Sequence, residues 1–132
     1  MAGYDIVSFY SDVPDMRRFL SAADAVIVPL RFGSGTRLKI LESFAAGVPV
    51  ISTEKGAEGI NCQDGYHLLI AQNSAHDFMN KIKLLAANKS LQQKLNDNAY
   101  NLVVQQYSIS VASRCLTEAI AQAQGQPPTK NL

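Results

Sequence analysis

The stretch VPLRFGSGTRLKILESFAAGVPV, residues 28–50, decides the fold of this chain, because it follows a strand–loop–helix–strand order. Residues 25–29 (AVIVP) are short, apolar and rich in β-branched side chains, which is typical of a buried strand. Gly33 and Gly35 then flank one serine, and both glycines accept a positive φ without strain. This pattern predicts a tight loop that leads directly from a strand into a helix.

A helical period begins at Thr36 and ends near Gly47. Gly47 is a typical helix terminator, and Pro49 cannot continue a helix, so the next strand is predicted over residues 48–52. The apolar positions of this helix form two neighbouring stripes, one of Leu38, Leu41 and Ala45 and one of Ile40 and Phe44.

The predicted helix begins where the preceding strand ends, and this geometry suits an anion. Free backbone N–H groups and the positive end of the helix dipole both favour a phosphate there. Arg37 and Lys39 add two charges in the first turn, where they oppose the dipole, so helix stability does not explain them. The alternative is an ordinary solvated basic face. A single Gly-x-Gly is itself a weak signal, since the third glycine of the dinucleotide fingerprint is absent.

Glu42 stands four residues after Leu38, on the side that we expect to face the core. One interpretation is a surface ion pair with Lys39, although lysine before glutamate is the poorer order for such a pair. The other interpretation is functional: a carboxylate accepts hydrogen bonds only, so it can bind two hydroxyl donors of a ribose whose phosphates lie at the helix start. The residues alone leave both interpretations open.

The segment PLRFGSGTRLKILESFAAGVPVISTEKGAEGI, residues 29–60, closely resembles the donor-binding segment of two-domain, retaining group-1 glycosyltransferases. The resemblance extends from about Val7 to Tyr107. It implies the C-terminal, nucleotide-sugar-binding domain of the GT-B type, an α/β fold with a mostly parallel, partly Rossmann-like sheet. It also implies a hexosyltransferase-like enzyme that moves a sugar from a nucleoside-diphosphate donor to a glycan or lipid acceptor, for example in polysaccharide biosynthesis, without a cofactor or metal.

The resemblance assigns roles to individual residues. Glu42 matches the glutamate that binds the donor ribose, and the loop before it matches the donor diphosphate site. We expect that site to comprise Gly33, Ser34, Gly35, Thr36, Arg37 and Lys39. Family members usually carry a second glutamate eight positions before the first, but this chain has Ser34 there, so the role of that carboxylate is unassigned and the catalytic residues stay unknown.

Two further loops are expected near the donor. By resemblance, the loop of Ser11 and Val13 lies near the base, although helix capping also explains Ser11. Residues 54–59 (EKGAEG) follow a strand end, and the resemblance puts them near the sugar or phosphates. An ordinary surface turn is the simpler interpretation of Glu58. His67 begins a predicted strand and is interpreted as structural.

Bulk composition excludes several classes. The 132 residues suit one domain, and a net charge of +1 gives no broad attraction to nucleic acid or anionic lipid. Cys62 and Cys115 form no C-x-x-C motif, which argues against zinc and favours a reduced cytoplasmic protein, with at most peripheral membrane contact. No apolar run approaches the roughly 20 residues of a membrane span, and no secretory signal is apparent.

The remaining elements complete an α/β order. Strands are predicted over residues 6–10 and 66–71, and a short helix over 15–22 with Met16, Phe19, Leu20 and Ala23 inward. Three helices follow: one from Ser74 to Asn88, one capped by Ser90 and interrupted at Ser108, and one over residues 111–123. We expect a domain over residues 1–123 and a disordered, Pro-containing tail over 124–132.

The resemblance also implies that the first two strand–helix units of the complete domain, and the whole acceptor domain, are missing. We therefore expect the chain alone to be nearly inactive and to form a homo-oligomer through an exposed sheet edge or apolar helix faces. Two alternatives are a stand-alone α/β phosphate-binding module and a protein-interaction module without ligand.

Overall fold

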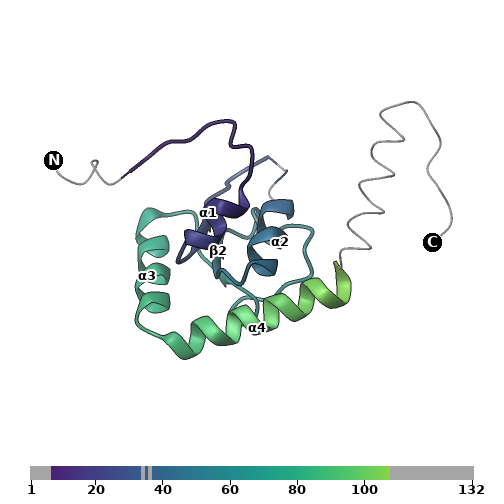
Figure 1. The fold of residues 1–132 in the computed structure, drawn as a ribbon. Helices are drawn as coiled ribbons and strands as arrows, with labels where there is room; N and C mark the ends of the chain where they lie inside the picture. The colour runs from purple at the N-terminus through teal and green to yellow at the C-terminus, as the bar shows by residue number, and fades with distance from the viewer. Residues whose placement is uncertain (1–6, 34, 36, 108–132) are drawn as a thin grey trace.

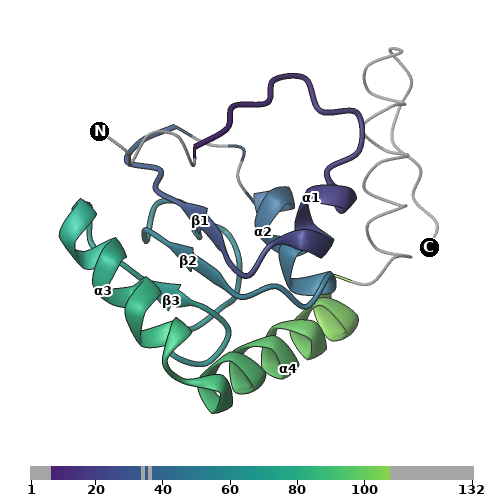
Figure 2. The same ribbon diagram turned by 60° about the vertical axis from the view of Figure 1, so that its left-hand side comes forward.

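A computed structural model describes residues 7–33, 35 and 37–107, and a parallel sheet of three strands lies at its centre (Figures 1 and 2). The strand order is β1-β2-β3, with Val26 opposite Val50 and Ile51 opposite Leu69. The elements are α1 (Arg17–Ala22), β1 (Val26–Val28), α2 (Arg37–Ala45), β2 (Val50–Ser52), β3 (Leu69–Ile70), α3 (Ala75–Ala86) and α4 (Lys89–Gln106).

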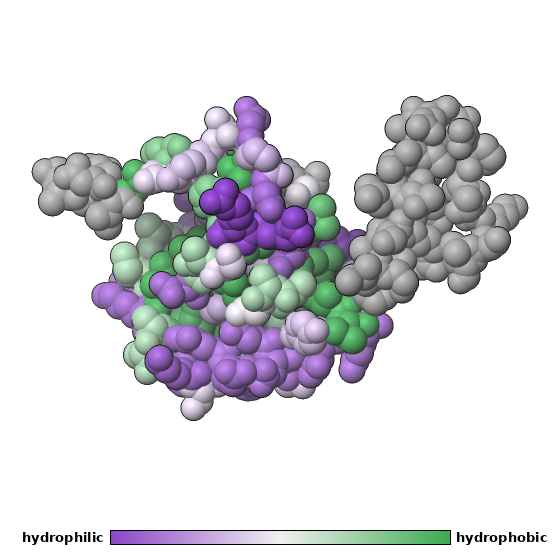
Figure 3. Space-filling model, in the orientation of Figure 1, coloured by the Kyte–Doolittle hydropathy of each residue, from purple (hydrophilic) through white to green (hydrophobic). Residues whose placement is uncertain are grey.

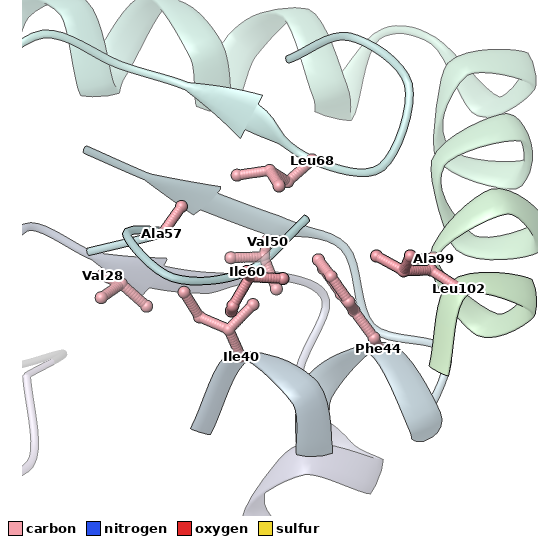
Figure 4. Close-up of a cluster of buried hydrophobic side chains, with 9 residues drawn as sticks. All are labelled: Val28, Ile40, Phe44, Val50, Ala57, Ile60, Leu68, Ala99 and Leu102. Carbon is pink, nitrogen blue, oxygen red and sulfur yellow. The ribbon is translucent and has the colours of Figure 1, made fainter. Parts of the chain in front are cut away.

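Helices cover both faces of the sheet, which confirms the predicted α/β class (Figure 2). On one face, side chains of α2 and α4 pack against β1 and β2 (Figure 4). This cluster comprises Val28, Ile40, Phe44, Val50, Ala57, Ile60, Leu68, Ala99 and Leu102. On the other face, Ile51 and Leu69 are buried beneath Phe78 and Leu85 of α3. Alternate residues of each strand therefore serve opposite layers, as the period of a strand requires.

The glycines that flank α2 adopt the conformations that the sequence predicts. Gly33 and Gly35 have φ values of +100° and +97°, and Gly47 has a φ of +75°. After α2, the backbone N–H of Val48 donates to the carbonyl of Ser43 at 3.0 Å, as in a Schellman motif. These turns make the chain reverse at both ends of α2 and return it to the sheet at β2.

The predicted N-cap of α3 is confirmed, whereas the predicted N-cap of α4 is wrong. The Ser74 side chain accepts from the backbone N–H of Asp77 at 3.1 Å. Asn88, rather than the predicted Ser90, caps α4, because its Oδ1 accepts from the N–H of Leu91 at 2.9 Å. Asparagine is as good a cap as serine, and α4 therefore begins at Lys89, directly after Asn88.

The strand predicted over residues 6–10 is wrong for the part that the structure describes, since residues 7–10 form no regular secondary structure and belong to no sheet. Their side chains are exposed, Phe9 to 92%. A strand needs a hydrogen-bonded neighbour, and β1 pairs only with β2 within the described residues. Ile6 lies outside those residues.

Two further predictions need correction. In α1 only Leu20 is buried, whereas Met16 and Phe19 are partly exposed, because few elements contact this short helix. The predicted strand 66–71 shortens to Leu69–Ile70, because a turn with hydrogen bonds from Tyr66 and His67 to the Gln63 carbonyl occupies its first residues.

The C-terminal predictions cannot be compared with the structure. The helix over residues 111–123, which contains Cys115, and the tail 124–132 lie outside the described residues. Among the helices that the structure describes, none is long and apolar enough to cross a membrane.

Candidate functional site

The loop after β1 and the first turns of α2 form the candidate site at the carboxyl ends of the strands. Gly33 and Gly35 are exposed, and Arg37 and Lys39 are exposed on the first turn of the helix. A Cβ atom at either glycine would meet nothing within 4 Å, so open space surrounds the loop. Ser34 and Thr36, two further predicted ligands, lie outside the described residues.

Glu42 faces solvent, so the prediction that it lies on the core side of α2 is wrong. The buried stripe of this helix is Ile40, Ser43 and Phe44, while Leu38 is 64% exposed. Since Leu38 and Glu42 share a face, both point outward. The physical reason is the large Phe44 ring, which fills the core together with Ile40 and thereby rotates the Leu38–Glu42 face to the surface.

No ion pair joins Lys39 and Glu42, both of which the structure describes. The ion pairs found among the described residues are Arg17–Asp15 and Lys55–Glu58. The surface-pair interpretation of Glu42 is therefore not realised, and its carboxylate is accessible on the helix that carries Arg37 and Lys39.

Arg37 has a partner that the sequence pattern does not reveal. Its guanidinium carbon lies 5.0 Å from the centroid of the Tyr107 ring, within the range of a cation–π contact. The Tyr107 hydroxyl accepts a long hydrogen bond of 3.4 Å from the backbone N–H of Asn61. Tyr107 is the C-cap residue of α4, so the end of α4 contacts both the start of α2 and the loop after β2.

Thr53 links the loops that follow β1 and β2. Its buried hydroxyl donates to the carbonyl of Leu30 and accepts from the backbone N–H of Gly56 at 3.0 Å. The N–H of Thr53 also donates to the carbonyl of Val28 at 3.2 Å. These bonds hold the segment predicted to lie near the donor sugar against the strand that leads into the site.

In the loop of residues 54–59, Glu54 and Glu58 are exposed, whereas Gly56 and Ala57 are buried. Lys55 Nζ lies 2.6 Å from Glu58 Oε2, and the Glu58 side chain is 65% exposed. The simple interpretation of Glu58 as a turn residue therefore agrees with the structure. Such an exposed pair contributes little to stability.

Val13 of the predicted base loop lines a cleft of about 630 Å³ beside α1, whereas Ser11 is exposed and outside that lining. Phe19 and Arg18 of α1 form the facing wall. Asp15 at the same cleft has a pKa below its usual value, because Arg17 donates hydrogen bonds to its carboxylate.

His67 and Cys62 have structural environments. The Nδ1 atom of His67 accepts from the backbone N–H of Gln63 at 2.9 Å, and burial lowers the pKa of the imidazole. Burial likewise raises the pKa of Cys62 to about 11, which keeps the thiol protonated at neutral pH. Within the described residues, no group of three or more potential ligands is arranged to hold a metal ion.

Comparison with known proteins identifies the class. The family model described as "Glycosyl transferases group 1" matches residues 2–88, about two-thirds of the chain, and the chain belongs to this family. The comparison with curated protein sequences finds no match.

Solved structures of glycosyltransferases share the fold. The C-terminal domain of the group 1 glycosyl transferase LpcC from Francisella tularensis is 26% identical, with a TM-score of 0.68 over 78% of this chain and 53% of that one. Sucrose-phosphate synthase from Thermosynechococcus elongatus is 20% identical, with a TM-score of 0.66 over 83% and 28%. A mutant of TarM from S. aureus, in complex with fondaparinux, alpha-GlcNAc-glycerol and UDP, is 21% identical, with a TM-score of 0.61 over 76% and 21%.

The similarity to sucrose-phosphate synthase and to TarM concerns the fold alone. The chain spans about half the length of the Francisella domain. The observed sheet and helices are thus part of a GT-B C-terminal domain.

Proposed function

We propose that this chain is the donor-binding portion of a glycosyltransferase that moves a sugar from a nucleoside-diphosphate donor to a glycan or lipid acceptor. The observation that carries the proposal is the exposed Glu42 carboxylate, which has no ion-pair partner among the described residues, on the helix that begins with Arg37 and Lys39. Glu42 lies five positions after Arg37 on the helix, which is about 7.5 Å along the axis. That spacing suits a ligand with phosphates at one end and hydroxyl groups at the other.

Each side chain then has a defined task. Arg37, Lys39 and the backbone of the Gly33–Thr36 loop bind the diphosphate, and Glu42 accepts hydrogen bonds from the ribose hydroxyls. The loop of Ser11 and Val13 contacts the base, and residues 54–59 lie near the sugar. The likeness to TarM, which was solved with UDP, supports a nucleotide ligand.

The proposal extends to the whole reaction. We infer hexosyl transfer with retention, in polysaccharide or glycolipid synthesis, in the cytoplasm or at the surface of a membrane. The chain spans only part of each similar structure, so we expect little or no turnover from it alone. Robust sugar transfer by this chain would contradict that expectation.

Thermal unfolding with added ligands tests the donor site. At a concentration 100 times its dissociation constant, a bound nucleoside diphosphate adds about 2.7 kcal/mol to the free energy of unfolding. This raises Tm by several degrees. We expect this from one of UDP, GDP and ADP. Glu42→Ala should weaken binding roughly tenfold to a hundredfold, because a hydrogen bond to a charged group contributes about 1.5–3 kcal/mol.

Asp97→Ala is the matched control, since it removes an exposed helical carboxylate on α4. No stabilisation by any nucleotide would contradict the donor site. Equal stabilisation by inorganic diphosphate, with no effect of Glu42→Ala, would indicate a general phosphate-binding module.

Tyr107 should position Arg37 for the diphosphate. Tyr107→Leu removes the ring beneath the guanidinium, and we expect the dissociation constant of UDP to rise roughly twofold to fivefold, as for an exposed cation–π contact. Tyr107→Phe keeps the ring and should stay close to wild type. Isothermal titration measures both variants, and equal affinities of the leucine and phenylalanine variants for UDP would exclude this role.

We also propose that the chain forms a homo-oligomer through an apolar helix face or through the edge of β1, which pairs only with β2 within the described residues. Ile27 of β1 is 44% exposed, whereas Ile51 and Leu69 on the same face of the sheet are buried. Parallel sheets are normally covered on both faces. Light scattering should show a dimer or larger species that Ile27→Lys dissociates. Leu84→Lys, on an exposed position of α3, tests the helix face. A monomer at every concentration would contradict the proposal.

A further inference from the structure

A second cleft, away from the residues assigned to the donor, lies between the 61–67 loop and the C-terminal half of α4. The volume of this cleft is about 420 Å³. Its lining is dominated by carboxamide side chains, those of Asn61, Gln63, Asn98, Asn101, Gln105 and Gln106. Tyr66, His67 and Leu102 complete the lining. We call this feature the amide cleft.

Hydrogen bonds between the two walls fix the shape of the amide cleft. Asn61 Nδ2 donates to Gln106 Oε1 at 3.3 Å, and Asn98 Nδ2 donates to the carbonyl of Tyr66 at 3.1 Å. Each end of the loop is thus joined to α4 by one hydrogen bond. The loop and the helix are therefore held together before any ligand arrives, which lowers the ordering cost of binding.

Three carboxamides in the cleft are available to a ligand. Within the part of the chain that the structure describes, the side chains of Gln63, Asn101 and Gln105 make no hydrogen bond. Asn101 and Gln105 are four residues apart on α4, so they point from the same face. Each carboxamide offers two N–H donors and one carbonyl acceptor. A ligand that both donates and accepts hydrogen bonds at closely spaced atoms fits this arrangement.

The amide cleft is uncharged. No aspartate, glutamate, lysine or arginine belongs to its lining, as far as the described residues form it. His67 Nδ1 already accepts a hydrogen bond from the backbone, so the neutral imidazole offers its other nitrogen as a donor. Lys94 lies 5.9 Å from the Tyr66 ring centroid, outside the lining. Charged ligands therefore find no partner of opposite sign in this lining.

Tyr66 supplies an apolar surface beside the amides. Its side chain is 46% exposed, and its ring lies nearly perpendicular to that of His67, with an interplanar angle of 79° and 4.8 Å between the centroids. A half-exposed tyrosine offers a flat apolar face and a polar tip. Among the described lining residues, Leu102 is the only aliphatic one and is itself buried, so the cleft offers little aliphatic surface to a ligand.

We propose that the amide cleft binds a neutral saccharide, whose hydroxyl groups pair with Asn101, Gln105 and Gln63 and whose ring lies against Tyr66. The proposal uses none of the residues assigned to the donor, so it stands or falls separately from the proposed function. It adds a second carbohydrate site, on the surface formed by α4.

Nuclear magnetic resonance of the ¹⁵N-labelled chain tests this site through its side-chain amide signals. Maltotriose and cellotriose are the neutral probes, and triglycine is the peptide probe. We expect one of the sugars to shift the Asn101 and Gln105 side-chain signals in a saturable way. The double variant Asn101→Ala/Gln105→Ala should raise the dissociation constant roughly tenfold.

The control is the double variant Asn73→Ala/Asn80→Ala, which removes two exposed carboxamides outside the amide cleft. It should bind the sugar like the wild type. Glu42→Ala should also leave sugar binding unchanged, which separates this site from the donor site. Absence of saturable shifts with either sugar would overturn the proposal. Shifts of the same signals by triglycine alone would also overturn it, and would identify a peptide-binding surface instead.

Discussion

Phe44→Ala should lower the free energy of unfolding by about 3–5 kcal/mol, the usual loss for a large aromatic side chain in a core. Phe44 is 1% exposed and lies between the sheet and α4, where it faces Ala99 and Leu102 (Figure 4). Few small domains exceed about 15 kcal/mol of total stability, so this single change removes a large share of it. Urea unfolding followed by circular dichroism measures the loss.

Leu38→Ala on the same helix is the matched control, because Leu38 is 64% exposed. Leu38→Ala should lower the free energy of unfolding by less than about 1 kcal/mol, as surface substitutions generally do. A small loss for Phe44→Ala, or equal losses for both variants, would mean that α2 presents a different face to the sheet. The exposure of Glu42 would then need revision as well.

Gly56→Ala should destabilise the chain by about 1–3 kcal/mol, the range for overpacking a buried site. A Cβ at position 56 would overlap with the Oγ of Ser52 and lie 3.2 Å from the backbone carbonyl of Val28. The carbonyl belongs to β1 and cannot rotate away. Chemical unfolding of the variant measures this effect.

A double-mutant cycle with Ser52→Ala separates the clash from other effects. Ser52→Ala removes the overlapping oxygen, so the double variant should recover part of the stability lost in Gly56→Ala. Strictly additive losses would exclude the clash with Ser52. The result matters for function, because Gly56 belongs to the proposed sugar-side loop and lies close to Val28 of β1.

Much of the fold follows from the local sequence signals. The positions of the three glycines around α2 predict backbone turns that favour positive φ, and all three glycines adopt it. Leu95, Ala99 and Leu102 recur at helical spacing along α4, and all three are buried. Such signals act within one or two turns of the chain, so a single sequence reveals them.

Other features depend on partners distant in the sequence. Residues 7–10 have the composition of a strand, yet strand formation also requires a neighbour that β1 does not provide. The direction of Glu42 depends on which of two apolar stripes of α2 fits the sheet. The contact of Arg37 with Tyr107 joins residues that are 70 positions apart, and no local sequence pattern predicts it.

The amide cleft likewise arises only in the folded chain. Its residues come from one loop and one helix that are separated by α3 (Figure 1). In the sequence they are scattered residues of a loop and of an amphipathic helix, and most of them are polar. Figure 3 shows that the hydrophilic surface of the molecule is extensive on the side of α4, so surface polarity alone does not distinguish this cleft.

The most direct test of the donor site is a map of backbone amide shifts in the ¹⁵N-labelled chain, titrated separately with UDP and GDP. We expect saturable shifts at Gly33 and Gly35 and along α2 from Arg37 to Glu42, with one of the two nucleotides preferred. We also expect Glu42→Ala to weaken these shifts at equal ligand concentration. Shifts confined to other parts of the chain, or none at saturating nucleotide, would contradict the assignment of this helix as the donor site.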